Sequence, residues 1–129
     1  MNREIRPPDL APPAAAYAHA VVSDNARRLL HTSGVVPIAP DGSVPTSIED
    51  QAAVVWANLR SIVAAAQMRM TDVVSVTTYV VVGQPLAAVM EARDRALDGH
   101  RAASTLVTVP ALARPEWLME IALVAAAES

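Results

Sequence analysis

Residues 72–82 read DVVSVTTYVVV, and this run is a strong signal for a β-strand. β-Branched residues dominate it, and such residues favour an extended strand. Two alternating sets of side chains, one beginning at Val73 and the other at Val74, are both mostly apolar. A strand with two apolar faces is usually covered on both sides. We therefore predict a central strand, and the rest of the chain must supply its neighbours and its covering layers.

A helical pattern precedes this strand. Ser47 is a predicted helix cap, with Asp50 three residues further on as a weak capping-box partner. Apolar residues then recur with helical period as far as Ala66. This single apolar stripe predicts a helix at about residues 47–66 that packs one face against the sheet.

A second helical pattern follows the strand. It opens at Pro85, ends at Asp98-Gly99 and predicts a helix at about residues 85–98. The stripe along one of its faces consists of Leu86, Val89, Met90, Arg93 and Leu97. An arginine therefore lies on an otherwise apolar helix face.

Shorter strands complete the predicted sheet, at about residues 17–22, 28–33, 104–109 and 117–126. Asp24-Asn25 between the first two predicts a turn, so we expect a hairpin there. Residues 1–15 are rich in proline and are predicted to form an extended arm rather than a regular element. The order ββαβαββ predicts one α+β domain over residues 1–129, a mixed β-sheet with both helices packed on one face.

Composition limits the function classes. Hydrophobic residues make up 53% of the chain, but most of them are Ala and Val and there is no Phe. A core built from such small side chains gains stability when further surface is buried between subunits, so the composition favours an oligomer. The net charge is −3 and Lys is absent, which argues against a nucleic-acid partner. No Cys is present, and the three His are far apart in sequence, so no disulfide and no local metal motif is predicted.

The start of the chain lacks a signal-peptide pattern, and no apolar run approaches the ~18 residues of a membrane span. We therefore expect a soluble protein of the cytoplasm.

Several short stretches, in order along the chain, resemble the RidA/YjgF family. They are Tyr17-Ala18-His19-Ala20, Ser33-Gly34, Glu49 with Gln51, Asn58-Leu59, Asp72-Val73-Val74, Thr77-Thr78-Tyr79, the run STLVTV at 104–109, and Met119-Glu120-Ile121. The resemblance extends from about residue 12 to about residue 126. It implies a chorismate-mutase-like fold and a homotrimer with clefts between neighbouring subunits. It also implies hydrolysis of reactive 2-enamines and 2-imines to 2-oxo acids and ammonia, with no cofactor.

Two residues are candidates for catalysis, Glu120 and Tyr17. Imine hydrolysis needs a group that positions and partly deprotonates water, and a carboxylate does this. Glu120 interrupts an apolar strand, where a charge is costly to bury without a partner. It is either the water-orienting group or a charge that is exposed or paired for structural reasons. Tyr17 either closes the cleft and donates a hydrogen bond or is a packed aromatic residue.

The candidates for substrate binding are Gly34, Ser104, Thr105 and Arg101. Gly34 either lets its backbone approach a ligand carboxylate or is a turn glycine, and Thr105 either bonds the ligand or only favours a strand. Deaminating members of the family carry an arginine where this chain has Ser104. A neutral hydroxyl in place of a guanidinium loses ~2–4 kcal/mol of anion binding. Arg101 either supplies the missing charge or is a surface residue, and Arg114 and Arg93 are weaker candidates.

Two functions remain open at this point. The first is a hydrolase acting on C=N bonds, an enamine or imine deaminase with an altered substrate, which the retained Glu120 and Tyr17 favour. The second is a non-catalytic trimer that binds or senses a small metabolite, which Ser104 favours. The two differ in whether a bound metabolite is turned over.

Overall fold

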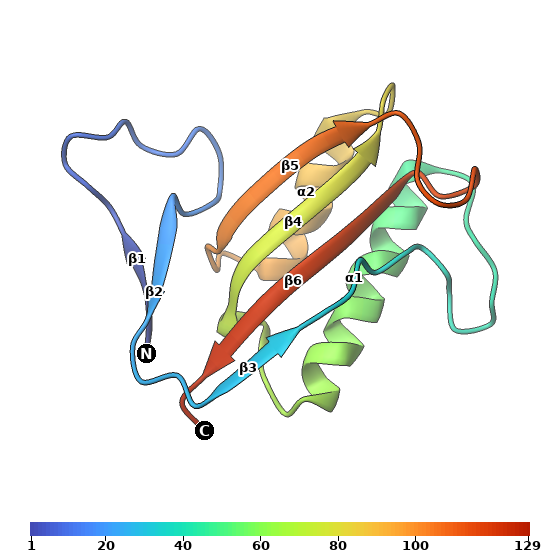
Figure 1. Ribbon diagram of the computed structural model, residues 1–129. Helices are drawn as coiled ribbons and strands as arrows, with labels where there is room; N and C mark the ends of the chain where they lie inside the picture. Colours follow the sequence, from blue (N-terminus) through green and yellow to red (C-terminus); the bar gives the residue numbers. More distant parts are fainter.

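Two long strands pair antiparallel through the centre of the main sheet, β4 (Val73–Val81) and β6 (Met119–Ala127). In the computed structural model, which describes residues 1–129, β5 (Ala103–Val109) pairs in parallel with β4, and β3 (Arg28–His31) pairs antiparallel with β6. The strand order is β3-β6-β4-β5, so the predicted central strand is confirmed (Figure 1). A register shift near the start of β4 marks a bulge.

Both helices lie against the same face of this sheet, as predicted (Figure 1). The first, α1 (Ile48–Ala65), begins where the Ser47 hydroxyl accepts the N–H of Asp50 at 3.1 Å. A short 3₁₀ helix, η1 (Met70–Asp72), leads from it into β4. The second helix, α2 (Leu86–Leu97), connects β4 to its parallel neighbour β5.

The core fills the space between the helices and the sheet. Its fully buried members come from alternate positions of the two long strands and from the α1 stripe: Val76, Val80, Met119, Ile121, Leu123, Ala52, Val55, Leu59 and Val63. These side chains are almost all small or medium aliphatics. The predicted helical stripe and the helix-facing half of the strand pattern therefore form one core.

Two predictions about the N-terminal third are wrong. Residues 17–33 do not form a hairpin: β2 (Ala20–Ser23) pairs with β1 (Asn2–Ile5), whereas β3 pairs with β6. The first fifteen residues are also not wholly an irregular arm, because β1 is a regular strand. The prolines begin only at Pro7, so residues 2–5 keep the N–H groups that a ladder requires.

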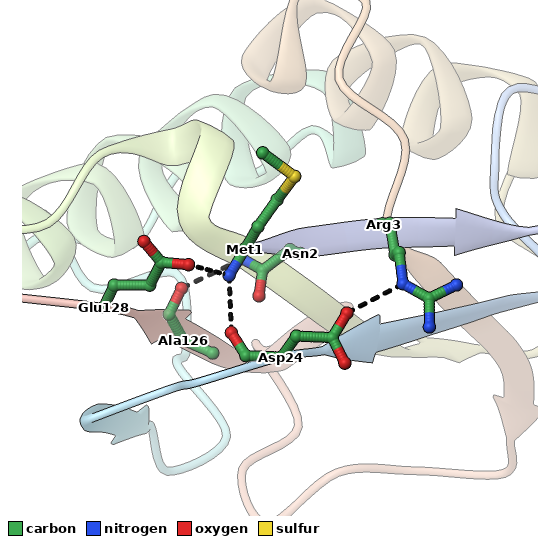
Figure 2. Close-up of polar contacts among 6 residues, drawn as sticks. All are labelled: Met1, Asn2, Arg3, Asp24, Ala126 and Glu128. Carbon is green, nitrogen blue, oxygen red and sulfur yellow. Dashed lines mark hydrogen bonds and ion pairs between the residues drawn. The ribbon is translucent and has the colours of Figure 1, made fainter.

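Figure 2 shows how the β1–β2 hairpin is fastened to the end of β6. The Asn2 side chain donates to the carbonyl of Ala126 at 2.9 Å. Within the hairpin itself, the Arg3 guanidinium donates to the Asp24 carboxylate at 2.7 Å. The amino group of Met1 contacts the Asp24 carbonyl and the Glu128 carboxylate. The small sheet is thus held beside the main one by polar contacts.

The other face of the main sheet carries no helix. We call it the open face; its members are Leu29, His31, Ser75, Thr77, Tyr79, Val81, Thr105, Val107, Glu120, Ala122 and Val124. Two of its apolar side chains are well exposed, Leu29 at 62% and Val107 at 40%. The expectation that both faces of β4 are covered is therefore wrong for a single chain, because both helices lie on the same side of the sheet.

Candidate functional site

Glu120 and Gly34 lie in contact on the open face. The Glu120 carboxylate covers the α-carbon of Gly34 so closely that a Cβ atom there would stand 1.7 Å from Oε2. The segment after β3 is fixed at this point by two backbone hydrogen bonds between Val35 and Ile121, of 2.7 and 3.1 Å. A side chain at position 34 would therefore displace the Glu120 carboxylate from this orientation.

Neither group is paired within the chain. No hydrogen bond or ion pair involves the Glu120 carboxylate, and the Gly34 N–H donates to no backbone carbonyl. The chain thus leaves a half-buried carboxylate and the peptide N–H of the glycine beneath it without protein partners. Such a pair offers one acceptor and one donor to a ligand or a water molecule.

Tyr79 stands directly beside Glu120 across the β4–β6 pairing, with Val107 next to it on β5. Directly opposed residues of neighbouring strands bring their side chains together. Tyr79 was not among the predicted site residues. The alternation in residues 72–82 places it on one face, but only the register with β6 shows that Glu120 is its neighbour.

Gln51 anchors the entrance to β6. Its side-chain amide donates to the carbonyls of Pro45 and Glu116, both at 2.8 Å, and its oxygen accepts the N–H of Leu118 at 2.9 Å. The residue is completely buried. These bonds tie α1 to the segment that ends two residues before Glu120, so they help to fix the start of the strand that carries the carboxylate.

Tyr17 and Arg101 meet at the outer edge of β5, away from Glu120. Arg101 donates to the Tyr17 carbonyl at 2.6 Å and forms an ion pair with Glu4 at 3.3 Å. The Tyr17 hydroxyl accepts the N–H of Ala14 at 3.3 Å, and the following residue, Ala18, bridges to Ala103. Arg101 therefore fastens the N-terminal segment to β5, and within one chain its guanidinium is engaged by these partners.

The carboxyl group of Glu4 shows the electrostatic effect of this cluster. Arg6 donates a hydrogen bond to it at 3.0 Å, and this bond, helped by the charge of Arg101 and opposed by burial, lowers the pKa of Glu4. A depressed carboxyl pKa stabilises the fold wherever the group is ionised. The contacts of Glu4 with Arg6 and Arg101 therefore weaken in acid, when the Glu4 carboxylate becomes protonated.

Ser104 and Thr105 are adjacent on β5 but point to opposite faces of the sheet. Thr105 pairs with Thr77 on the open face. Ser104 lies on the helix side, where its hydroxyl accepts a long hydrogen bond of 3.4 Å from Arg93 of α2. The buried position of Arg93 confirms that it belongs to the core-facing stripe of α2.

One chain thus brings the predicted site residues together only in part. Glu120, Gly34 and Thr105 share the open face, with β4 between Thr105 and Glu120, so that two strand spacings, about 10 Å, separate their strands. Tyr17 and Arg101 are at the edge of β5, and Ser104 is on the opposite face. No group of three His, Asp or Glu side chains converges as a metal site would require.

A mixed four-stranded sheet with two helices on one face is the fold that this chain shares with solved Rid-family structures. The chain belongs to this family: its residues 9–127 match the family model described as endoribonuclease L-PSP. Neither helix has the combination of length and apolar character that a bilayer crossing demands.

Solved structures share the fold over nearly the whole chain. A Rid-family protein of unknown function from Yersinia pestis, YyfB, superimposes with a TM-score of 0.88 at 32% identity, covering 98% of both chains. TdcF of Escherichia coli, solved with bound serine, superimposes with a TM-score of 0.72 at 23% identity, covering 97% of this chain and 98% of TdcF. The expected fold is confirmed by these likenesses.

One relative carries a name that describes a chemical activity. TdcF of Escherichia coli K12, named as a reactive intermediate deaminase, is 29% identical over 75 residues. The matched region covers 57% of this chain and 58% of TdcF. The chain therefore matches somewhat more than half of the length of that relative.

Proposed function

We propose that this protein is a hydrolase that deaminates a reactive enamine or imine. In the reaction a water molecule adds to the imine carbon, the C–N bond breaks, and a carbonyl compound and ammonia leave. The family and the name of TdcF support this class of chemistry. We expect the reaction to run in the cytoplasm and without a cofactor.

The observation that carries the proposal is the unpaired carboxylate of Glu120 against Gly34. A carboxylate that is half-buried and bonded to no protein group is available to hold a water molecule and to accept its proton during attack. The Gly34 N–H next to it can donate to the ligand, and the Tyr79 side chain stands alongside. Tyr17 would close the cleft.

The cleft itself is proposed to form between copies of the chain in a homotrimer. Within one chain the candidate residues lie on two faces and one edge of the sheet. The open face carries no helix within one chain, and covering it would bury exposed apolar side chains such as Leu29 and Val107. Packing of this face against a second copy would place the Glu120 region of one subunit near the β5 edge of another.

Ammonia release tests this function. Purified protein is incubated with a panel of imines and enamines generated in place, some with a carboxylate and some without, and ammonia is measured. We expect faster release with wild-type protein than with buffer, and a loss of at least about 100-fold in Glu120→Gln, because a general base contributes roughly 10²–10⁴. No acceleration with any member of the panel would refute the proposal.

The second candidate, a non-catalytic trimer that binds a small metabolite, is favoured by Ser104. A serine there cannot supply the charge of a guanidinium, and Arg101 is already engaged by Glu4 and Tyr17. This function predicts thermal stabilisation by a metabolite that is recovered unchanged. Turnover of the same metabolite would exclude it.

A further inference from the structure

A groove with a volume of about 280 Å³ runs between α1 and α2. Both helices cover the same face of the main sheet (Figure 1), and exposed residues such as Ala53 and Arg95 border the groove, so it opens to solvent on the helical side. Its floor consists of the buried residues Ala52, Trp56 and Ala96. Alanines on both helices leave this space, because their short side chains cannot fill it.

The side chain of Trp56 is an unusual member of this floor. Trp56 is only 3% exposed, and its indole N–H has no hydrogen-bond partner. A buried tryptophan normally finds an acceptor for this N–H, because a buried donor without one loses its hydration without compensation. The chain itself provides no such acceptor, so an oxygen atom of a ligand in the groove would supply the missing partner.

Two arginines border the groove from opposite helices, Arg60 on α1 and Arg95 on α2. Neither forms an ion pair within the chain. The Arg60 side chain makes a single hydrogen bond, in which Nη2 donates to the carbonyl of Ala96 at the long distance of 3.5 Å. Guanidinium groups that are not paired with a carboxylate of the protein remain available to an anionic ligand.

The polar donors gather at one end of the groove. Trp56 and Arg60 are four residues apart on α1 and are therefore neighbours on one face of that helix. The bond from Arg60 to Ala96 places Arg60 against the last turn of α2, which also carries Arg95. The one acidic residue of the lining, Glu49, lies eleven residues before Arg60, about 16 Å along the helix. A ligand anion beside Arg60 therefore meets positive groups and no carboxylate of the lining.

The rest of the groove favours an apolar and flat ligand. Its surface consists largely of alanine methyl groups and the ring of Trp56, which offer contact area but no further hydrogen bonds. Small-molecule sites usually have volumes of roughly 300–1,000 Å³, so this groove is at the lower limit. A volume of this size admits one or two aromatic rings with one charged group.

We propose that this groove binds an aromatic carboxylate of one or two rings. The carboxylate accepts hydrogen bonds from Arg60, Arg95 and the indole N–H of Trp56, and the ring packs on the alanines of the floor. The groove is on the helical side of the sheet, whereas Glu120 is on the open face. Binding in the groove is therefore separate from the proposed hydrolysis and does not depend on it.

The indole N–H signals of the two tryptophans test the site by nitrogen–proton correlation NMR. 2-Naphthoate is titrated into the isotope-labelled protein, with uncharged 2-naphthamide as the matched probe, and Trp117→Phe assigns the two signals. We expect 2-naphthoate to shift the signal of Trp56 and 2-naphthamide to leave it in place. Trp117, whose indole N–H also lacks a partner but lies outside the groove, is the internal control and its signal should not move.

Surface variants test the individual contacts. Arg60→Gln and Arg95→Gln should each weaken the binding of 2-naphthoate at least about tenfold, because each removes a charged donor. Arg27→Gln, at an exposed position between β2 and β3, is the charge control and should bind like wild type. Ala53→Leu should fill the groove and block binding, whereas Ala64→Leu, exposed on the same helix but outside the groove, should not.

Four results would overturn the inference. They are a Trp56 signal that does not move at millimolar 2-naphthoate, equal movement of both indole signals, equal binding of 2-naphthamide, and unchanged affinity in the arginine and Ala53 variants. All of these variants change exposed residues, so loss of the fold does not obscure the outcome.

Discussion

The carboxylate of Glu120 rests on the backbone of Gly34, with Oε2 only 1.7 Å from the position that a Cβ atom would take. The two residues are far apart in sequence and meet because the segment after β3 pairs with β6 at Val35 and Ile121. A side chain at residue 34 and this orientation of Glu120 are mutually exclusive. The orientation of the Glu120 carboxylate therefore depends on the segment that contains Gly34 as well as on β6.

Gly34→Ala should impair function with little loss of stability. The added methyl group meets the flexible end of Glu120, which can swing away, so the free energy of unfolding should fall by no more than about 1 kcal/mol. Ammonia release should fall at least tenfold, equivalent to ~1.4 kcal/mol of the barrier, because the carboxylate leaves its position. Thermal melting measures the change in stability, and the ammonia assay measures the change in activity.

A double-mutant cycle with Glu120→Gln separates this explanation from a general disturbance. If Gly34 acts through Glu120, Gly34→Ala should cost little further activity in the Glu120→Gln background. Fully additive losses would show that the glycine acts by another route.

Gln51→Ala should destabilise the protein by about 2–4 kcal/mol. The side chain makes three hydrogen bonds of 2.8–2.9 Å while completely buried, and each is worth roughly 1 kcal/mol. Asn58→Ala, which removes one bond to the Ile38 carbonyl, is the matched comparison and should cost about 1 kcal/mol. Urea denaturation at constant m-value measures both. Equal losses in the two variants would contradict the assignment of Gln51 as the anchor of β6.

Val107→Asp should convert a trimer into a monomer. Val107 is 40% exposed on the open face, and a carboxylate buried there by a second copy would lack a partner. Light scattering coupled to gel filtration should give three times the 13.6 kDa chain mass for wild type and one chain mass for the variant. Leu86→Asp, a change on the helical side of the sheet, is the control, and its measured mass should equal that of wild type. A wild-type monomer would contradict the proposed intersubunit cleft.

Acid should loosen the N-terminal hairpin through Glu4. Its folded-state pKa is lowered, chiefly by the hydrogen bond from Arg6, so its stabilising effect is complete above the ordinary glutamate pKa and is lost as pH falls through the depressed value. Amide NMR signals of residues 2–5 should shift together as the pH falls below the ordinary glutamate pKa and through the lowered pKa of Glu4. In Glu4→Gln the same signals should show no such transition.

The main sheet was predictable because its signals are local and strong. The β-branched run before Val82, the helical period after Ser47 and the left-handed stop at Asp98 each depend on neighbours within one element. The pairing of β1 with β2 could not be predicted, because both strands are short and partly polar and their sequences show no pattern that selects a partner. The choice between β2 and β6 as the neighbour of β3 depends on contacts between distant segments.

The site was predictable only as a set of residue types. Sequence reasoning selected Glu120 and Gly34, but their contact depends on a cross-strand register that no local pattern contains. Arg93 was visible as a cation on an apolar stripe, and its direction toward Ser104 became clear only from the packing of α2 under β5. The side-chain direction of Ser104 followed from strand alternation once Val76 was identified as its partner.

The position of β6 has a consequence for how the protein is made. This strand lies between β3 and β4 in space although it is the last of the chain's strands to be synthesised. Until β6 leaves the ribosome, β3 has no strand partner and β4 is paired only with β5. The strand edges that β6 later covers therefore remain exposed during synthesis. A ribosome that pauses before Met119 would hold a nascent chain that is prone to aggregate, and completion of the final strand joins the two halves of the sheet in one step.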